Sequence, residues 1–422
     1  MLKKKNGNNT NYKKFLIIFI LIILFLFFQQ KASNKIFSYD DSTYFTAWAT
    51  AIHRTSLPPI KLNNKSLRQI IRVSSSGEKI RIKFSNILGK SKLELKRVCI
   101  ADVINNSVIN EKSMKFLTFN GNKNVVIKSG EEIYSDTIEY PLKALSKVAI
   151  SIYFGSVPKY ISGHYLSLTY SYIENGYSII KKEFSGIKKI AHWYFISAME
   201  ISSDNPKKTI VCFGDSITDG VSKTGDARNN YPDILSEKLQ NNIKNSNVSV
   251  INEAIDGDRL TLMGIQRYEH DVLDAKGVGY IISLIGVNDI NGLNSTSTEI
   301  ITIYKQMIKK AHERNIFIYA GTILPFALYE TKKYRWNEEK EKARLEVNNW
   351  IRTTKPEDGG FDEFFDFDQF LKNPQNESQL NKIYDCGDGI HPNYKGYQKI
   401  VDCIKDLSIF NKKPNFKKSS NN

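Results

Sequence analysis

The stretch TIVCFGDSITDG, residues 209–220, decides the fold class of the C-terminal half of the chain. Its first five residues form an apolar run of the length of a buried strand, and Gly214 ends that run with a tight turn. Ser216 follows at the expected start of a helix, where a backbone N–H has no partner within the helix. A buried strand that turns directly into a helix is the opening unit of an α/β domain.

The residues that follow keep alternating between strand-like and helical patterns. Apolar runs of strand length occur at residues 248–251, 280–285, 316–320 and 364–367, and helical patterns occur at residues 231–239, 299–313, 338–351 and 397–407. Strands that alternate with helices predict a parallel sheet with helices on both faces. We therefore expect a three-layer α/β domain at residues 205–410, followed by a basic tail at residues 411–422.

Residues 40–204 have a different rhythm of short alternating stretches. Period-two patterns or short apolar runs occur at residues 69–73, 79–84 and 148–152, and turn clusters such as residues 74–77 separate them. Many short strands with such punctuation predict an all-β sandwich of the jelly-roll kind. This β-sandwich domain could bind a polysaccharide, shape the rim of an active site or stabilise the domain that follows.

Residues 15–28 form an uninterrupted apolar run, FLIIFILIILFLFF, behind a lysine-rich start. This length fits the core of a signal peptide better than a membrane-spanning helix, which needs about 20 residues. The region around Ala32 is not a clean small-x-small cleavage site, so an uncleaved anchor stays open. We expect residues 1–35 to be a signal peptide or an N-terminal membrane anchor. The protein would then be secreted, or anchored to the outer face of the membrane.

The composition is that of a globular protein, with 422 residues of which 41% are hydrophobic and 25% charged. Nine lysines stand at the two ends without an acidic residue, and subtracting them from the net charge of +16 leaves +7 for the rest. Basic blocks at termini are usually solvated tails or topology signals, so nucleic acid is not expected as a partner. The four cysteines show no CxxC spacing, and a bridge between Cys386 and Cys403 stays open.

Three of the expected strands are followed directly by residues suited to catalysis. Ser216 offers a hydroxyl and a backbone N–H, Gly257 in NEAIDG can present a backbone N–H, and Asn288 in GVND can present a side-chain N–H. The carboxyl ends of parallel strands meet at one edge of the sheet, where sites form in such folds. Taken alone, each residue is also explained as a capping or turn residue.

The fourth element is the segment DGIH, residues 388–391, followed by Pro392. An acid placed three residues before a histidine in a turn can orient the imidazole, which then removes a proton from a serine hydroxyl. The sequence thus predicts Ser216 as the nucleophile, His391 as the base and Asp388 as the group that orients the base. The other five histidines are interpreted as surface or structural residues.

The same elements supply donors for a tetrahedral oxyanion. We expect the backbone N–H groups of Ser216 and Gly257 and the side-chain amide of Asn288 to hold it. No serine lies in a GxSxG motif, which argues against the usual nucleophile elbow of α/β-hydrolases. Neither an HxxxH pair nor a Cys/His cluster is present, so no metal and no cofactor is expected.

Together these blocks resemble the four that name the SGNH/GDSL hydrolases. They are GDS at Ser216, NxAxxG ending at Gly257, GVND at Asn288 and DxxH at Asp388 and His391, within about residues 209–407. The resemblance implies a flavodoxin-like three-layer fold, no metal, and hydrolysis of esters or occasionally thioesters. The chain departs from many members at Ala254, where they carry glycine, and it reads GDSI in place of GDSL.

A narrower resemblance extends over both halves. The segments TAWATA (46–51), SLRQIIRVSSSGEKIRIKFSN (66–86) and GTILPF (321–326) are similar to a secreted two-domain branch related to arylesterases and acetylxylan-type esterases. In that branch a β-sandwich precedes the hydrolase, which implies an esterase that removes acetyl groups from an acetylated polysaccharide or oligosaccharide. Two alternatives stay open. One is a membrane-associated lipid acylhydrolase or lysophospholipase, and the other is a non-catalytic glycan-binding surface protein that keeps the SGNH scaffold.

Overall fold

The computed structural model describes residues 43–54, 61–185, 188–203, 207–220, 230–242, 248–331, 334–414 and 416. The expected signal or anchor segment, with its apolar run at residues 15–28, lies outside these residues. Within the described part, which begins at Thr43, no helix has the length and hydropathy needed to cross a bilayer. From Tyr44 onward the chain forms one compact unit.

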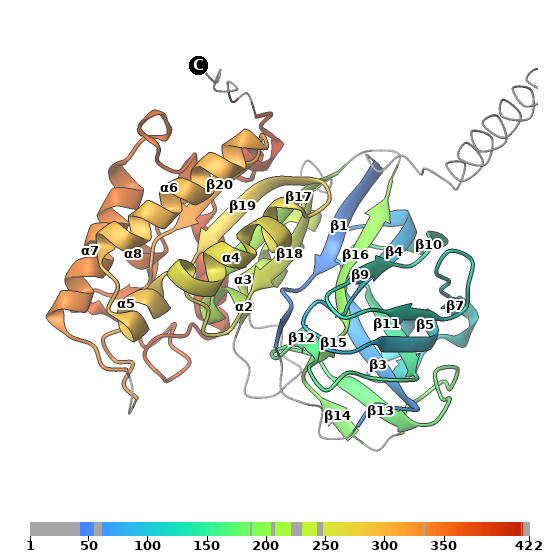
Figure 1. The fold of residues 1–422 in the computed structure, drawn as a ribbon. Helices are drawn as coiled ribbons and strands as arrows, with labels where there is room; N and C mark the ends of the chain where they lie inside the picture. Colours follow the sequence, from blue (N-terminus) through green and yellow to red (C-terminus); the bar gives the residue numbers. More distant parts are fainter. Residues whose placement is uncertain are drawn as a thin grey trace, which may run out of the picture. The chain divides into compact units, whose positions relative to one another are not determined.

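The C-terminal half is built on a five-stranded parallel sheet (Figure 1). Its strand order is β18 (Val248–Ala254), β17 (Lys208–Gly214), β19 (Val278–Leu284), β20 (Phe317–Gly321) and β21 (Glu363–Phe365). In order of sequence this is 2-1-3-4-5, the doubly wound order of flavodoxin-like folds. The central strands are almost continuous runs of buried apolar residues, as a sheet covered on both faces requires. The predicted three-layer α/β fold is confirmed.

Two groups of helices pack on this sheet. The first group contains α3 (Tyr231–Gln240), α8 (Phe367–Leu371) and α9 (Tyr394–Cys403), and the second contains α5 (Val287–Leu293), α6 (Ser297–Glu313) and α7 (Glu338–Thr353). Apolar side chains of both groups share one core with the strands. The remaining helical segments are short: α2 (Ser216–Asp219), the π-helical η4 (Leu260–Gly264) and η5 (Tyr268–Leu273), and α4 (Ile265–Arg267) between them.

Two local features differ from the expectations. The last helix begins at Tyr394 rather than at residue 397, because the Asn393 side chain accepts a hydrogen bond from the Gly396 N–H and caps the helix there. It ends at Cys403, and the next residues form a separate 3-10 turn, η7 (Leu407–Asn411). The hairpin of β22 (Lys372–Asn373) and β23 (Asn376–Leu380) was not expected, because its polar sequence lacks an apolar alternation.

The N-terminal half consists of two antiparallel sheets, which confirms the predicted β-sandwich. One sheet runs β1 (Tyr44–Ala49), β16 (Ile196–Ser202), β4 (Gly77–Ser85) and β10 (Ile138–Leu142), with β9 (Glu132–Tyr134) on β4. The other runs β14 (Lys188–Ile190), β13 (Ser171–Asn175), β3 (Lys65–Arg72), β11 (Lys147–Phe154), β5 (Leu93–Asn105) and β6 (Val108–Ile109), with β7 (Lys115–Phe116) and β8 (Val125–Ile127) on β5. Buried side chains of both sheets form one core, for example Leu67, Ile82 and Ile150.

A small third sheet and strand β1 connect this sandwich to the α/β half. The small sheet runs β15 (Trp193–Tyr194), β12 (Ser162–His164) and β2 (His53–Arg54). At β1, the carbonyl of Thr46 accepts hydrogen bonds from the hydroxyls of Ser249 (2.7 Å) and Thr209 (3.2 Å). One residue beyond β1, Thr50 forms a parallel bridge with Asn252 of β18. The strand that begins the sandwich therefore also contacts the first two strands of the parallel sheet.

Candidate active site

The central strands of the parallel sheet end side by side. Gly214 at the end of β17 is level with Ala254 of β18 and with Leu284 of β19. The N–H of Ile255 donates to the Gly214 carbonyl at 3.2 Å, so the chain that leaves β18 passes over the end of β17. The segments that carry the predicted nucleophile and the predicted oxyanion donors therefore start at one edge of the sheet.

The predicted nucleophile, Ser216, is the first residue of the short helix α2. Asp215 caps this helix, because its carboxylate accepts the N–H of Ile217 at 3.1 Å. A Cβ on Gly214 would lie 2.1 Å from the Thr218 hydroxyl oxygen, so only glycine allows the turn to close this tightly. The Ser216 residue is 4% exposed, so it is buried at the strand end.

Ser216, His391 and Asp388, called the triad below, are joined by hydrogen bonds. His391 Nε2 lies 2.8 Å from Ser216 Oγ, and His391 Nδ1 lies 2.7 Å from Asp388 Oδ2. The other oxygen of Asp388 accepts the backbone N–H of His391 at 2.9 Å, which fixes the carboxylate on the loop. Burial would raise the pKa of Asp388, but the hydrogen bonds and the charge of His391 outweigh it and hold that pKa well below its usual range. A serine, an imidazole and an ionised carboxylate in this order can activate the hydroxyl.

The expected oxyanion donors lie on loops at the same sheet edge. Gly257 is exposed and has a φ of +72°, and a Cβ there would meet nothing within 4 Å. Within the described residues, the backbone N–H groups of Ser216 and Gly257 have no acceptor. Asn288 stands in the first turn of α5, where its Nδ2 donates to the Asp258 carbonyl at 3.1 Å, and the second hydrogen of this amide has no acceptor among the residues that the structure describes. Neither Gly257 nor Asn288 is bonded to a triad residue in the described part of the chain.

An arginine outside the sequence motifs, with a side chain that is 11% exposed, holds the loop after β18. Arg267 binds the carboxylate of Asp258 at 2.7 Å through Nε, the Glu253 carbonyl at 2.6 Å and the Gly214 carbonyl at 3.2 Å. It thereby ties the loop of Gly257 to the end of β17. Sequence reasoning missed Arg267, because it lies in the π-helical region after the motif and no spacing marks it.

A histidine of the sandwich half also reaches this edge. His164 of β12 is buried, and its Nε2 lies 3.0 Å from Asp219 Oδ1. Asp219 is the last residue of α2, the helix that starts with Ser216. From the sequence, His164 is expected to be a surface or structural histidine, and no local pattern connects it with residues so far along the chain.

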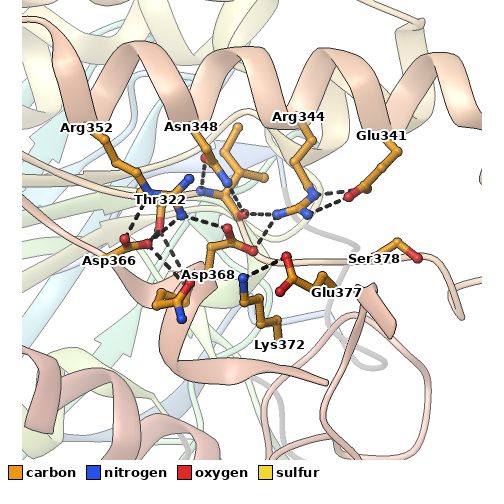
Figure 2. Close-up of polar contacts among 12 residues, drawn as sticks. Thr322, Glu341, Arg344, Asn348, Arg352, Asp366, Asp368, Lys372, Glu377 and Ser378 are labelled. Carbon is orange, nitrogen blue, oxygen red and sulfur yellow. Dashed lines mark hydrogen bonds and ion pairs between the residues drawn. The ribbon is translucent and has the colours of Figure 1, made fainter. Parts of the chain in front are cut away.

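A buried cluster of ion pairs fixes the loop that follows β20 (Figure 2). Arg344 of α7 contacts Asp368 at 2.6 Å and donates to the Ile323 carbonyl at 3.0 Å. Asn348, one turn further along α7, binds both the N–H and the carbonyl of Ile323 (2.8 and 2.9 Å). Arg352 binds the other oxygen of Asp368 at 2.7 Å. The main chain just after β20 is therefore clamped to α7.

This clamped loop supports the loop that carries the base. Gly389 has a φ of +85°, and a Cβ there would lie 2.5 Å from the backbone carbon of Leu328. The ring of Tyr329 meets the His391 ring edge to face at a centroid distance of 6.2 Å. The packing requires glycine at this position and leaves the imidazole little room to turn away from Ser216.

The site also contains a group of possible metal ligands. Ligand atoms of Cys386, Asp388 and His391 lie within 4.8 Å of one another. Burial and the Asp388 carboxylate raise the pKa of the Cys386 thiol to about 11. The hydrogen bonds of the triad account for the approach of the other two residues. Cys386 and Cys403 are free thiols, with no bridge between them.

Comparison with known proteins assigns the region that contains this site to a protein family. The family model described as GDSL-like Lipase/Acylhydrolase matches residues 210–404. No curated protein matches the chain significantly.

Solved structures with a slight likeness include three described as follows. A GDSL-like lipase from Bacteroides thetaiotaomicron is 18% identical over 47% of this chain and 86% of that one, with a TM-score of 0.36. A member of the lipolytic protein G-D-S-L family from Veillonella parvula is 22% identical over 46% and 95%, with a TM-score of 0.36. A variant of an acetyl-xylooligosaccharide esterase from Geobacillus Stearmophilus is 17% identical over 46% and 91%, also with a TM-score of 0.36. Likeness of this degree carries no argument about the substrate.

The family match covers every block from GDS to DxxH, so the resemblance stated from the sequence is confirmed. Residues 210–404 belong to the GDSL-like lipase and acylhydrolase family, the SGNH hydrolases, and the protein is an ester-hydrolysing enzyme.

Proposed function

We propose that the triad hydrolyses an ester through an acyl-enzyme intermediate. His391 removes the proton of the Ser216 hydroxyl as its oxygen attacks the ester carbonyl carbon, and Asp388 holds the imidazole in the required tautomer. The N–H groups of Ser216 and Gly257 and the free amide hydrogen of Asn288 bind the oxyanion. The intermediate collapses as His391 protonates the leaving alcohol, and a water molecule then releases the acid by the reverse sequence. The observation that supports this role is the chain of hydrogen bonds at 2.8 and 2.7 Å.

We further propose that the acyl group is short, with acetyl esters of a carbohydrate as the substrate. The support is the two-domain resemblance found in the sequence, together with the near-complete burial of Ser216, which favours a small acyl group over a long chain. We also propose that the enzyme acts outside the cytoplasm, on the strength of the lysine-rich apolar start of the chain.

The test compares the full-length protein with its Ser216→Ala variant. Both are assayed on p-nitrophenyl acetate, butyrate and palmitate and on acetylated xylan. We expect hydrolysis of the acetate and butyrate esters and acetate release from xylan, with all of it lost in Ser216→Ala.

Each alternative has its own outcome in the same assays. A preference for palmitate would replace the carbohydrate substrate with a lipid. Equal inactivity of two folded proteins on every ester would contradict the catalytic role and leave glycan binding to be measured.

A further inference from the structure

The hydrogen bonds around Asp219 link the sandwich to both halves of the predicted oxyanion site. Asp219 Oδ1 lies 3.0 Å from His164 Nε2, and Asp219 Oδ2 accepts the backbone N–H of Asp256 at 3.1 Å. Asp256 immediately precedes Gly257. One carboxylate thus connects a strand of the sandwich with the loop that presents the Gly257 N–H.

The same carboxylate belongs to the helix that begins with Ser216. The N–H of Asp219 donates to the Asp215 carbonyl at 2.9 Å, which closes the single turn of α2. The Asn252 side chain donates to the Asp219 carbonyl at 3.3 Å and attaches that turn to β18. A shift of Asp219 would therefore move the turn that carries Ser216 relative to the loop of Gly257.

His164 has the partners of a charged imidazole. Its Nδ1 lies 2.9 Å from the Ala51 carbonyl, and its other nitrogen faces the Asp219 carboxylate. Burial disfavours the charge on His164, but the Asp219 carboxylate outweighs it and raises the pKa. The neighbouring His53, whose ring lies 5.3 Å away, has its pKa lowered to about 4 by burial and by His164. An imidazolium with both N–H groups engaged is a rigid support for the carboxylate.

We propose that His164 and Asp219 are positioning residues that set the distance between the Ser216 and Gly257 N–H groups. The sandwich then completes the active site of the enzyme rather than only stabilising it. This inference rests on the proposed esterase function. The physical reason is that oxyanion donors act only when they are held at the place where charge develops, and small displacements weaken them strongly.

Another ion pair between the same two halves offers a matched control. Arg72 of β3 contacts Glu237 at 2.9 Å and Asp233 at 3.9 Å, and both acids lie on α3 rather than on α2 or on the loop of Gly257. An Arg72→Gln variant removes a contact between the halves without disturbing the proposed positioning.

The first measurement is steady-state hydrolysis of p-nitrophenyl acetate by full-length Asp219→Ala, Asp219→Asn, His164→Gln and Arg72→Gln. We expect kcat to fall about 10- to 100-fold in Asp219→Ala and His164→Gln, with KM within about twofold of wild type. Asp219→Asn keeps an acceptor for the Asp256 N–H, so we expect it to recover most of kcat. Arg72→Gln should keep kcat while lowering the melting temperature.

The second measurement is hydrogen–deuterium exchange of the segment 252–260, which does not depend on activity. We expect faster exchange there in Asp219→Ala and His164→Gln but not in Arg72→Gln. Folded Asp219→Ala and His164→Gln proteins with wild-type kcat and unchanged exchange would overturn the inference. If wild-type hydrolysis survives Ser216→Ala, the proposed function fails instead, and the exchange data still decide whether the pair holds the loop.

Discussion

Asp388 binds His391 twice, once through the imidazole Nδ1 at 2.7 Å and once through the backbone N–H at 2.9 Å. The second bond holds the carboxylate in place, so the first can fix the direction of the ring. The carboxylate therefore selects the tautomer that carries its proton on Nδ1. The free electron pair then lies on Nε2, which faces Ser216.

We therefore expect Asp388→Asn to lower kcat by about 10²- to 10⁴-fold, because an amide that donates to Nδ1 places the proton on the wrong nitrogen. The melting temperature should change little, since asparagine can still accept the His391 N–H. The measurement is kcat on p-nitrophenyl acetate together with thermal unfolding. A folded Asp388→Asn enzyme within about tenfold of wild type would show that Asp388 does not orient the base.

We expect Gly389→Ala to destabilise the protein by about 2–4 kcal/mol, because the new Cβ must displace the backbone of Leu328 at a residue with a positive φ. Gly387→Ala is the matched control, with a φ of +105° but nothing within 4 Å of the added Cβ. The control should lose only the cost of the backbone conformation, about 1–2 kcal/mol. Urea unfolding measures both, and equal losses would mean that Leu328 yields without cost.

We expect the Asp215→Asn variant to have a larger free energy of unfolding than the wild type, by a margin that grows as the pH rises. Burial raises the pKa of Asp215 to about 7, whereas its pKa in the unfolded chain is about 3.9. The Asp215 carboxyl therefore binds its proton more tightly in the folded state than in the unfolded chain. Its contribution to the free energy of unfolding is fully present below about pH 4 and is lost as the pH rises through 7. Asparagine keeps the acceptor for the Ile217 N–H and has no charge to bury. The gain at pH 8 should be on the order of 2–4 kcal/mol.

Urea unfolding at pH 5 and at pH 8 measures this difference. Glu313→Gln, which alters a carboxylate that is 55% exposed, serves as the control and should give the same stability difference at both pH values. A pH-independent effect of Asp215→Asn would show that Asp215 is ionised in the folded protein throughout this range.

We expect Arg344→Met to destabilise the protein by about 3–5 kcal/mol, because it leaves the buried Asp368 carboxylate with one cation fewer and removes one of the two hydrogen bonds to the Ile323 carbonyl. Lys342→Met is a control on the same helix, where the lysine is 78% exposed and lies 3.9 Å from Glu346. That exposed pair should contribute under about 1 kcal/mol. Equal effects of the two substitutions in chemical unfolding would contradict the clamping role of Arg344.

The sequence predicted those parts of the enzyme that depend on local patterns. Strand β17 and the turn to Ser216 are determined by residues adjacent in the sequence. The Asp388–His391 loop is also local, because a three-residue spacing in a turn brings the carboxylate and the imidazole together. The predicted order of strands and helices follows from the same short-range periodicity.

The sequence could not predict contacts that depend on the packing of distant segments. His164 meets Asp219 only because the sandwich packs against β18, and Arg267 meets Asp258 only because a π-helical turn brings it back over β17. The amide of Asn288 was expected to donate to the oxyanion, and the structure adds that one of its hydrogens binds the Asp258 carbonyl.

The pairing of strand β1 has a consequence for folding during synthesis. Tyr44 pairs with Ser202 and Ala49 with Ala198, so the sandwich can close only when the chain has been synthesised up to the residues just before β17. Pairing strands that are so far apart in the sequence is slow, so β1 keeps an unpaired edge until β16 has been synthesised and pairs with it. The last strand of the sandwich and the first strand of the hydrolase then emerge in succession. A chain cut short before β16 would leave β1 without its antiparallel partner in the sandwich.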